Sequence, residues 1–110
     1  MSEEQNENQI EVYESPVFSK AIKRLPEAVL EAVEDAIDKV VDNPEIGVQK
    51  KGDLSYMRVY KFSVERQQFL LGYSWQEERL TLYLLNLGPH ENFYRDAKKR
   101  RPADKKLIDD

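Results

Sequence analysis

The sequence predicts an α+β domain: an N-terminal strand and two helices precede an antiparallel sheet of about four strands and a short C-terminal helix. Three observations lead to this class. An apolar stripe of helical period runs from Leu30 to Val41, runs rich in β-branched and aromatic residues follow residue 55, and only a few polar residues join these runs. Helices that precede consecutive strands are typical of helices packed on one face of an antiparallel sheet.

The N-terminal part of the chain predicts one strand and two helices. Alternation in IEVY, residues 10–13, indicates a short strand. The pair Ser15-Pro16 is a helix-start signal, so a short helix is expected up to Leu25. Pro26 begins a second helix, which the pair Asn43-Pro44 ends. The core-facing stripe of this second helix consists of Leu30, Val33, Ile37, Val40 and Val41.

The C-terminal part predicts a loop and three strands. EIGVQKKGDLS, residues 45–55, has two glycines and no periodicity, and predicts a loop in which Lys50 and Lys51 are solvated. Strands are expected in YMRVYKFSV, QQFLLGYSW and RLTLYLLNLG, with hairpins at VERQ and QEER. Met57 and Val59 are expected to face the helices, which leaves Arg58 among tyrosines on an open face of the sheet.

Both ends of the chain are expected to lie outside a single folded domain of residues 9–101. Residues 1–8 are interpreted as a disordered acidic leader, and residues 102–110 as a disordered tail. Gly88 and Pro89 close the last strand, so His90 is expected to start the short final helix.

The composition limits the class of protein. A chain of 110 residues without cysteine builds one core, without disulfides or thiolate chemistry. It contains no run of about 18 apolar residues and no secretory leader, so we expect a cytoplasmic protein with no membrane partner. A single histidine without cysteine partners disfavours a structural zinc site. We expect no metal and no cofactor.

The formal net charge of −4 is unevenly distributed. Residues 1–14 contain five glutamates and no basic residue, so they carry −5 and the rest of the chain carries +1. Residues 95–110 contain seven basic and four acidic residues, a net charge of +3. This basic end could attract phosphates through counterion release, although a solvated helix end carries the same kinds of charge.

The segment LGPHENFYRDAKKR, residues 87–100, combines groups suited to RNA cleavage. His90, Tyr94 and Lys98 follow at intervals of four, so they share one stripe of a helix. Imidazole exchanges protons near neutral pH, and a phenol can donate a hydrogen bond or stack. Cations can neutralise the charge that develops when a ribose 2′-OH attacks phosphorus, a reaction that needs neither a metal nor a protein nucleophile. An ordinary exposed helix, with His90 only capping or packing, remains the alternative interpretation.

The order and spacing of segments resemble the RelE/ParE superfamily of type II toxin–antitoxin toxins over about residues 10–101. The resemblance is strongest at NPEIG, YMRVYKF and GPHENFYRD, with FLLGY between the last two. The resemblance implies a small toxin that is silenced by a cognate antitoxin. The C-terminal segment of the antitoxin wraps around the toxin. RelE-like members enter the ribosomal A site and cleave mRNA, whereas ParE-like members poison DNA gyrase with the same fold.

The resemblance also implies roles for individual residues. Arg58 matches the first sheet cation of the family, His90 falls where members place a basic or histidine side chain after the strand-ending glycine, and Tyr94 matches the tyrosine of the last helix. These three are the expected catalytic residues, gathered in one pocket. Further RNA contacts are expected from their charge alone at Lys61, Arg95, Lys98 and Lys99.

The chain departs from the RelE-like pattern at one strand and in its overall charge. RelE-like nucleases carry an arginine just before the position of FLLGY, where this chain has only Gln67, Gln68, Phe69 and Leu70. The sequence pI of about 5.1 is also low for a ribosome-binding toxin. The leading hypothesis is a ribosome-dependent endoribonuclease; the alternatives are a non-enzymatic gyrase inhibitor and an inactive member that only binds its antitoxin. The antitoxin is expected to supply an apolar and acidic segment.

Overall fold

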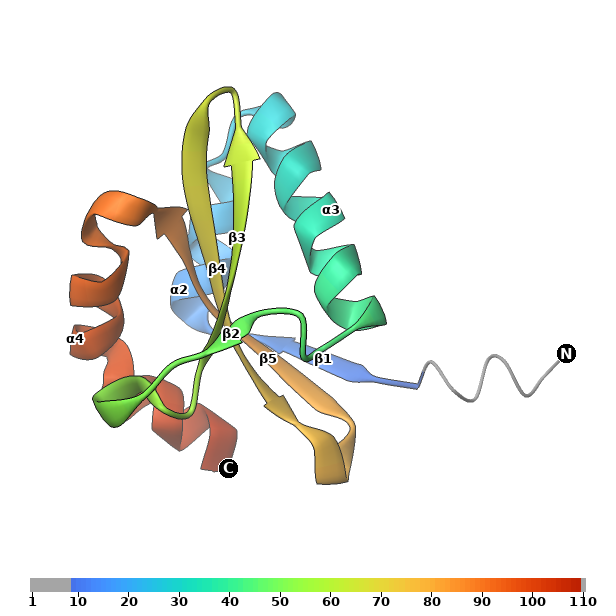
Figure 1. Cartoon of the computed structure of the whole chain (residues 1–110), viewed down its shortest axis with the longest axis vertical. Helices are drawn as coiled ribbons and strands as arrows, with labels where there is room; N and C mark the ends of the chain where they lie inside the picture. Colours follow the sequence, from blue (N-terminus) through green and yellow to red (C-terminus); the bar gives the residue numbers. More distant parts are fainter. Residues whose placement is uncertain (1–8, 110) are drawn as a thin grey trace, which may run out of the picture.

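The computed structural model describes residues 9–109 and has the α+β class predicted from the sequence (Figure 1). The acidic leader predicted at residues 1–8 lies outside the described residues. The elements in chain order are β1 (Glu11–Glu14), α2 (Pro16–Lys23), α3 (Glu27–Asp42), β2 (Val48–Gln49), the 3-10 turn η1 (Gly52–Leu54), β3 (Arg58–Val64), β4 (Gln67–Gln76), the 3-10 turn η2 (Glu77–Arg79), β5 (Thr81–Pro89) and α4 (His90–Asp109).

The strands form one mixed sheet in the order β1-β5-β4-β3-β2. Two consecutive antiparallel hairpins join β3, β4 and β5, as predicted, and β2 pairs antiparallel with β3. The prediction of a purely antiparallel sheet is wrong at β1, which runs parallel to β5 with Glu11 opposite Thr81. Alternation along a strand shows which residues share a face, but it carries no information about the direction of the neighbouring strand.

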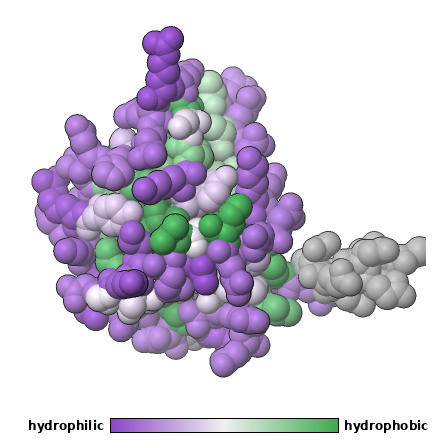
Figure 2. Space-filling model, in the orientation of Figure 1, coloured by the Kyte–Doolittle hydropathy of each residue, from purple (hydrophilic) through white to green (hydrophobic). Residues whose placement is uncertain are grey.

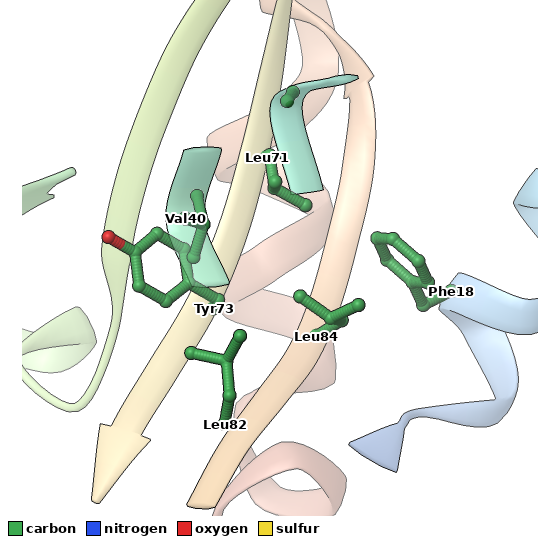
Figure 3. Close-up of a cluster of buried hydrophobic side chains, with 7 residues drawn as sticks. Phe18, Val40, Leu71, Tyr73, Leu82 and Leu84 are labelled. Carbon is green, nitrogen blue, oxygen red and sulfur yellow. The ribbon is translucent and has the colours of Figure 1, made fainter. Parts of the chain in front are cut away.

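α2 and α3 cover one face of the sheet (Figure 1). The helix predicted between Pro26 and Asn43 is α3, and its Val40 is fully buried, as is Phe18 of α2. Figure 3 shows both side chains around buried residues of β4 and β5. The sheet residues of this core are Leu71, Tyr73, Leu82 and Leu84.

α4 covers the opposite face. Its Phe93 and Ala97 are buried against Val59 of β3 and against Met57, which directly precedes β3. The prediction that Met57 and Val59 face the N-terminal helices is therefore wrong, because they face α4. Both faces of the sheet are covered, so both sets of alternating residues are apolar, and the pattern does not tell which set meets which helix.

The C-terminal helix is longer than predicted. α4 spans 20 residues, so the prediction of a short helix is wrong, and the prediction of a disordered tail at residues 102–110 is wrong over the described residues 102–109. Pro102 lies inside the helix and removes one backbone hydrogen bond. Tertiary contacts hold this part of the helix instead, since Ile108 is buried against Tyr83 and Leu85. No helix within residues 9–109 combines the length and apolar character needed to cross a bilayer.

A buried polar pair also fixes the distal half of α4. Asn86 on β5 donates a hydrogen bond from Nδ2 to Oδ2 of Asp104 over 3.1 Å. The register of the β4–β5 pair shifts between Gly72 and Tyr73: Gly72 pairs with Asn86, whereas Tyr73 pairs with Leu84. This irregularity turns the Asn86 side chain toward α4. Burial raises the pKa of Asp104, against the lowering effects of the Asn86 hydrogen bond and the Arg100 charge. The folded protein therefore holds a proton on Asp104 more tightly than the unfolded chain does.

We expect the free energy of unfolding to decrease as the pH rises from the ordinary Asp104 pKa of 3.8 through its raised folded-state pKa. In that interval the folded state binds more protons than the unfolded state, so deprotonation favours unfolding. The Asp104→Asn variant keeps an acceptor for Asn86 without the charge and should lack this decrease. Urea titrations of both proteins between about pH 4 and pH 8 measure it. A stability difference between them that is constant with pH would contradict this prediction.

Candidate functional site

His90 stands where β5 passes directly into α4. β5 ends at Pro89 and α4 begins at the next residue, so the sheet fixes the start of the helix. His90 is exposed, while Phe93, one turn further, is buried beneath the helix. Gly72 on β4 makes room for Phe93: a Cβ at Gly72 would lie 2.8 Å from Phe93 Cζ and 2.8 Å from Met57 Sδ. The glycine of FLLGY therefore allows the first turn of α4 to pack closely against the sheet.

The first two turns of α4 bring three rings into contact. Tyr94 is half-buried, and its ring meets that of Phe93 edge-on, with centroids 5.2 Å apart at 86°. His90 meets Tyr94 at 80°, with centroids 6.1 Å apart. The helical spacing of His90 and Tyr94 predicted this contact. Because Phe93 anchors Tyr94, the imidazole and the phenol have a defined relative position at the surface.

A lysine from a distant loop completes this group. The Lys50 Nζ lies 5.0 Å from the centroid of the Tyr94 ring, a distance at which an ammonium interacts favourably with the ring. The sequence predicts Lys50 to be a solvated loop residue, and no signal in it connects Lys50 with residue 94. We call Lys50, His90 and Tyr94 the α4 cluster.

The cations predicted to contact RNA lie at different distances from the α4 cluster. Lys98 follows Tyr94 by one helical turn, on the same flank of α4. Lys61 is on the α4 face of the sheet: it pairs with Leu70, and Leu70 pairs with Gly88, which places Lys61 about 10 Å from the strand end that precedes His90.

Two other predicted cations point elsewhere. Arg95 is exposed, and its Nε lies 3.9 Å from Oδ1 of Asp96. Lys99 follows Tyr94 by five positions, which turns it about 140° around the helix axis. It lines a cleft of about 370 Å³ together with Val17 of α2 and Pro89. Charge alone therefore did not identify which cations accompany His90 and Tyr94.

Arg58 lies on the other face of the sheet. It is paired with Tyr73, whose ring belongs to the core beneath α2 and α3. Its Nη1 donates to the carbonyl oxygens of Glu45, at 3.1 Å, and Gly47, at 2.7 Å. The prediction that Arg58 shares a pocket with His90 and Tyr94 is wrong, because the sheet separates the guanidinium from the α4 cluster.

The NPEIG segment explains what Arg58 contacts. The Tyr73 hydroxyl donates to the Pro44 carbonyl oxygen at 2.7 Å and accepts from the Gly47 N–H at 2.9 Å. Arg58 binds two carbonyl oxygens of the same segment. The turn after α3 is therefore held by a buried tyrosine and an arginine, so NPEIG and Arg58 have structural contacts that sequence spacing did not reveal.

Comparison with known proteins gives a family and a fold. The family model described as ParE-like toxin of type II bacterial toxin–antitoxin systems matches residues 12–98. The chain is similar in structure to a double-substitution mutant of the Escherichia coli RelE toxin in its free state. The TM-score is 0.65 at 19% identity, and the match covers 83% of this chain and 96% of that chain. Comparison with curated proteins gives no match.

Structures of toxin–antitoxin complexes show the same fold. The toxin of the intact E. coli RelBE complex is 18% identical, with a TM-score of 0.60 over 74% of this chain and 98% of that chain. The archaeal RelE–RelB complex from Pyrococcus horikoshii OT3 gives 20% identity and a TM-score of 0.52, over 74% of this chain and 96% of that chain. At these identities the likeness concerns the fold.

Proposed function

This chain belongs to the ParE-like toxins of type II bacterial toxin–antitoxin systems, and we propose that it stops growth by cleaving mRNA on the ribosome. It is a toxin of the RelE/ParE superfamily, as the sequence predicted. The observation that carries the proposal of RNA cleavage is the contact between the exposed His90 imidazole and the Tyr94 phenol, with cations at their side.

The proposed reaction needs two proton transfers. The ribose 2′-oxygen forms a bond to phosphorus while the bond from phosphorus to the 5′-oxygen breaks, giving a 2′,3′-cyclic phosphate and a 5′-hydroxyl. We assign His90 to accept the proton of the 2′-OH and Tyr94 Oη to donate a proton to the departing 5′-oxygen. The two groups come from consecutive turns of one helix, so a phosphodiester bound across them would meet both.

Positive charge near the α4 cluster suits a phosphodiester substrate. Lys98 lies on the same flank of α4, and Lys61 lies on the same face of the sheet. Cations placed where negative charge develops on phosphorus lower the barrier most when their position is fixed beforehand. Arg58 is not part of this proposal, because its guanidinium binds backbone carbonyls on the opposite face.

A second candidate function is non-enzymatic inhibition of DNA gyrase. It is favoured by the position of Arg58 away from the α4 cluster, together with the lack of an arginine in residues 67–70. On this alternative, the cluster and its cations form a binding surface without chemistry. An inactive member that binds only its antitoxin is the third possibility.

Induction of the gene in a bacterial host, followed by pulse labelling, tests the proposal. We expect incorporation of labelled amino acids to stop first, with cuts in mRNA at ribosome-occupied positions. Filamentation with DNA breaks, before any fall in protein synthesis, would support gyrase inhibition and contradict RNA cleavage. No growth arrest from folded protein would point to an inactive member.

The proposed partner is a cognate antitoxin, and the proposed compartment is the cytoplasm, where ribosomes are found. Solved structures of RelE neighbours of this fold contain an antitoxin or an antitoxin peptide. Hydrophobic side chains interrupt the mainly hydrophilic surface near the middle of Figure 2, and Val48 of the edge strand β2 is 63% exposed. An apolar and acidic antitoxin segment is complementary to such side chains beside cations. Co-expression of the adjacent reading frame should restore growth and co-purify with the toxin.

A further inference from the structure

Lys50 is the one member of the α4 cluster that does not belong to α4. It is half-buried, and its ammonium stands over the Tyr94 ring at 5.0 Å. It belongs to the connection between β2 and η1, which is distant in sequence from α4. Its neighbour Lys51 is exposed and has no ring contact among the described residues. Two adjacent lysines therefore have different positions relative to Tyr94.

The loop that carries Lys50 is held at both of its ends. The Lys50 N–H donates to the Met57 carbonyl oxygen at 3.0 Å, and Gln49 Nε2 donates to the Ser55 carbonyl oxygen. Arg101 of α4 donates from Nε to the Asp53 carbonyl oxygen at 2.8 Å, which ties the loop to the helix that bears Tyr94. Leu54 packs in the same core cluster as Phe93. The backbone from which Lys50 projects is thus fixed relative to the α4 cluster.

Lys50 keeps its charge available to a ligand. Within residues 9–109, no carboxylate lies within ion-pair distance of Lys50, and its ammonium is placed against the Tyr94 ring. Arg58 differs, because its Nη1 already binds two carbonyl oxygens at the turn after α3. A cation beside a proton-exchanging pair, without an acidic partner, is suited to a phosphate oxygen.

We propose that Lys50 contacts the reacting phosphate and neutralises the charge that develops on it, so that Lys50, His90 and Tyr94 form one site. This inference rests on the proposed RNA cleavage and adds to it the cation that the sequence did not identify. A phosphate bound between the Lys50 ammonium and the His90 imidazole would lie beside the Tyr94 ring, which both groups contact. Lys50 would then act in the chemical step, whereas Lys61 and Lys98 would hold the RNA chain.

The test uses the purified full-length toxin and mRNA on programmed ribosomes, in single-turnover cleavage at increasing toxin concentration. Lys50→Gln should lower the cleavage rate at saturation by about 10²-fold, as loss of one donor to a developing negative charge does, and leave the half-saturating concentration nearly unchanged. Lys51→Gln is the matched control, since it removes the same charge from the neighbouring exposed residue, and should change the saturating rate by less than about threefold. Lys50→Arg should retain more activity than Lys50→Gln, because it keeps the charge.

Each outcome decides between the two proposals. If wild type cleaves mRNA but Lys50→Gln cleaves as fast as Lys51→Gln, the role of Lys50 is wrong and RNA cleavage stands. If Lys50→Gln raises only the half-saturating concentration, Lys50 is a docking residue and its proposed contact with the reacting phosphate is wrong. If wild type leaves ribosome-bound mRNA intact, the proposed function fails and this inference fails with it. Thermal unfolding midpoints equal to that of wild type will show that the variants are folded.

Discussion

Replacing His90 by alanine should lower the rate of mRNA cleavage by about 10²–10⁴-fold, the range that a positioned general acid or base contributes. The imidazole is exposed and packs only edge-on against Tyr94, so the free energy of unfolding should change by less than about 0.5 kcal/mol. Single-turnover cleavage on programmed ribosomes and urea unfolding measure the two quantities. Asn92→Ala is the matched control, because Asn92 is an exposed residue in the same turn of α4.

Tyr94→Phe separates the phenol hydroxyl from the ring. The variant keeps the ring contacts with His90, Phe93 and Lys50 and removes only the proposed proton donor. We expect a loss of rate of about 10²-fold. A fully active Tyr94→Phe would restrict Tyr94 to stacking, and a His90→Ala variant that remains folded and fully toxic would show that the α4 cluster is not the active site.

Gly47→Ala should lower the free energy of unfolding by about 2–4 kcal/mol, through overpacking and broken hydrogen bonds. Gly47 is buried, and a Cβ there would lie 2.7 Å from the Tyr73 hydroxyl and 3.0 Å from the backbone carbonyl carbon of Val59. Tyr73 is fully buried, so its ring cannot move aside without disturbing the core beneath α3. Its bonds to Pro44 and to the Gly47 N–H would be lost with that movement.

Gly88→Ala is the matched control for this substitution. Within residues 9–109, no atom beyond its chain neighbours lies within 4 Å of a Cβ at Gly88, so the free energy of unfolding should change by less than about 1 kcal/mol. Urea denaturation of both variants gives the comparison. Equal free energies of unfolding for the two variants would contradict this prediction. They would mean that the turn after α3 can shift to accept a methyl group at residue 47, and that Tyr73 and Arg58 hold NPEIG less tightly than their hydrogen bonds indicate.

Part of the candidate site was predictable because it is local. His90 and Tyr94 are neighbours on consecutive turns of one helix, and helical spacing alone places their rings together. Lys98 follows on the same flank for the same reason. Lys50 was not predictable, since its contact with Tyr94 depends on a loop that hydrogen bonds to Met57, just before β3, and to Arg101. A contact between segments far apart in a single sequence leaves no periodic signal.

Arg58 shows the same limit for the sheet. Alternation correctly separates Met57 and Val59 from Arg58, Tyr60 and Phe62, so the sequence alone predicts the two sets. Both faces are covered by helices, however, and each set is mainly apolar. Only the packing of α4 shows that Met57 and Val59 face the α4 cluster. Arg58 therefore lies on the opposite face from His90.

By itself, the sequence determined the α+β class, helix α3, the hairpins of β3–β5 and the helical stripe of His90 and Tyr94, because each depends on local periodicity, turn residues or spacing. The tertiary structure decided the parallel pairing of β1, the face on which Arg58 lies, the length of α4 and the place of Lys50. These four features depend on contacts between distant segments. Ile108 and Asp104 illustrate the reason: a polar helix containing a proline is stable here because β5 offers an apolar patch and the Asn86 amide beneath it.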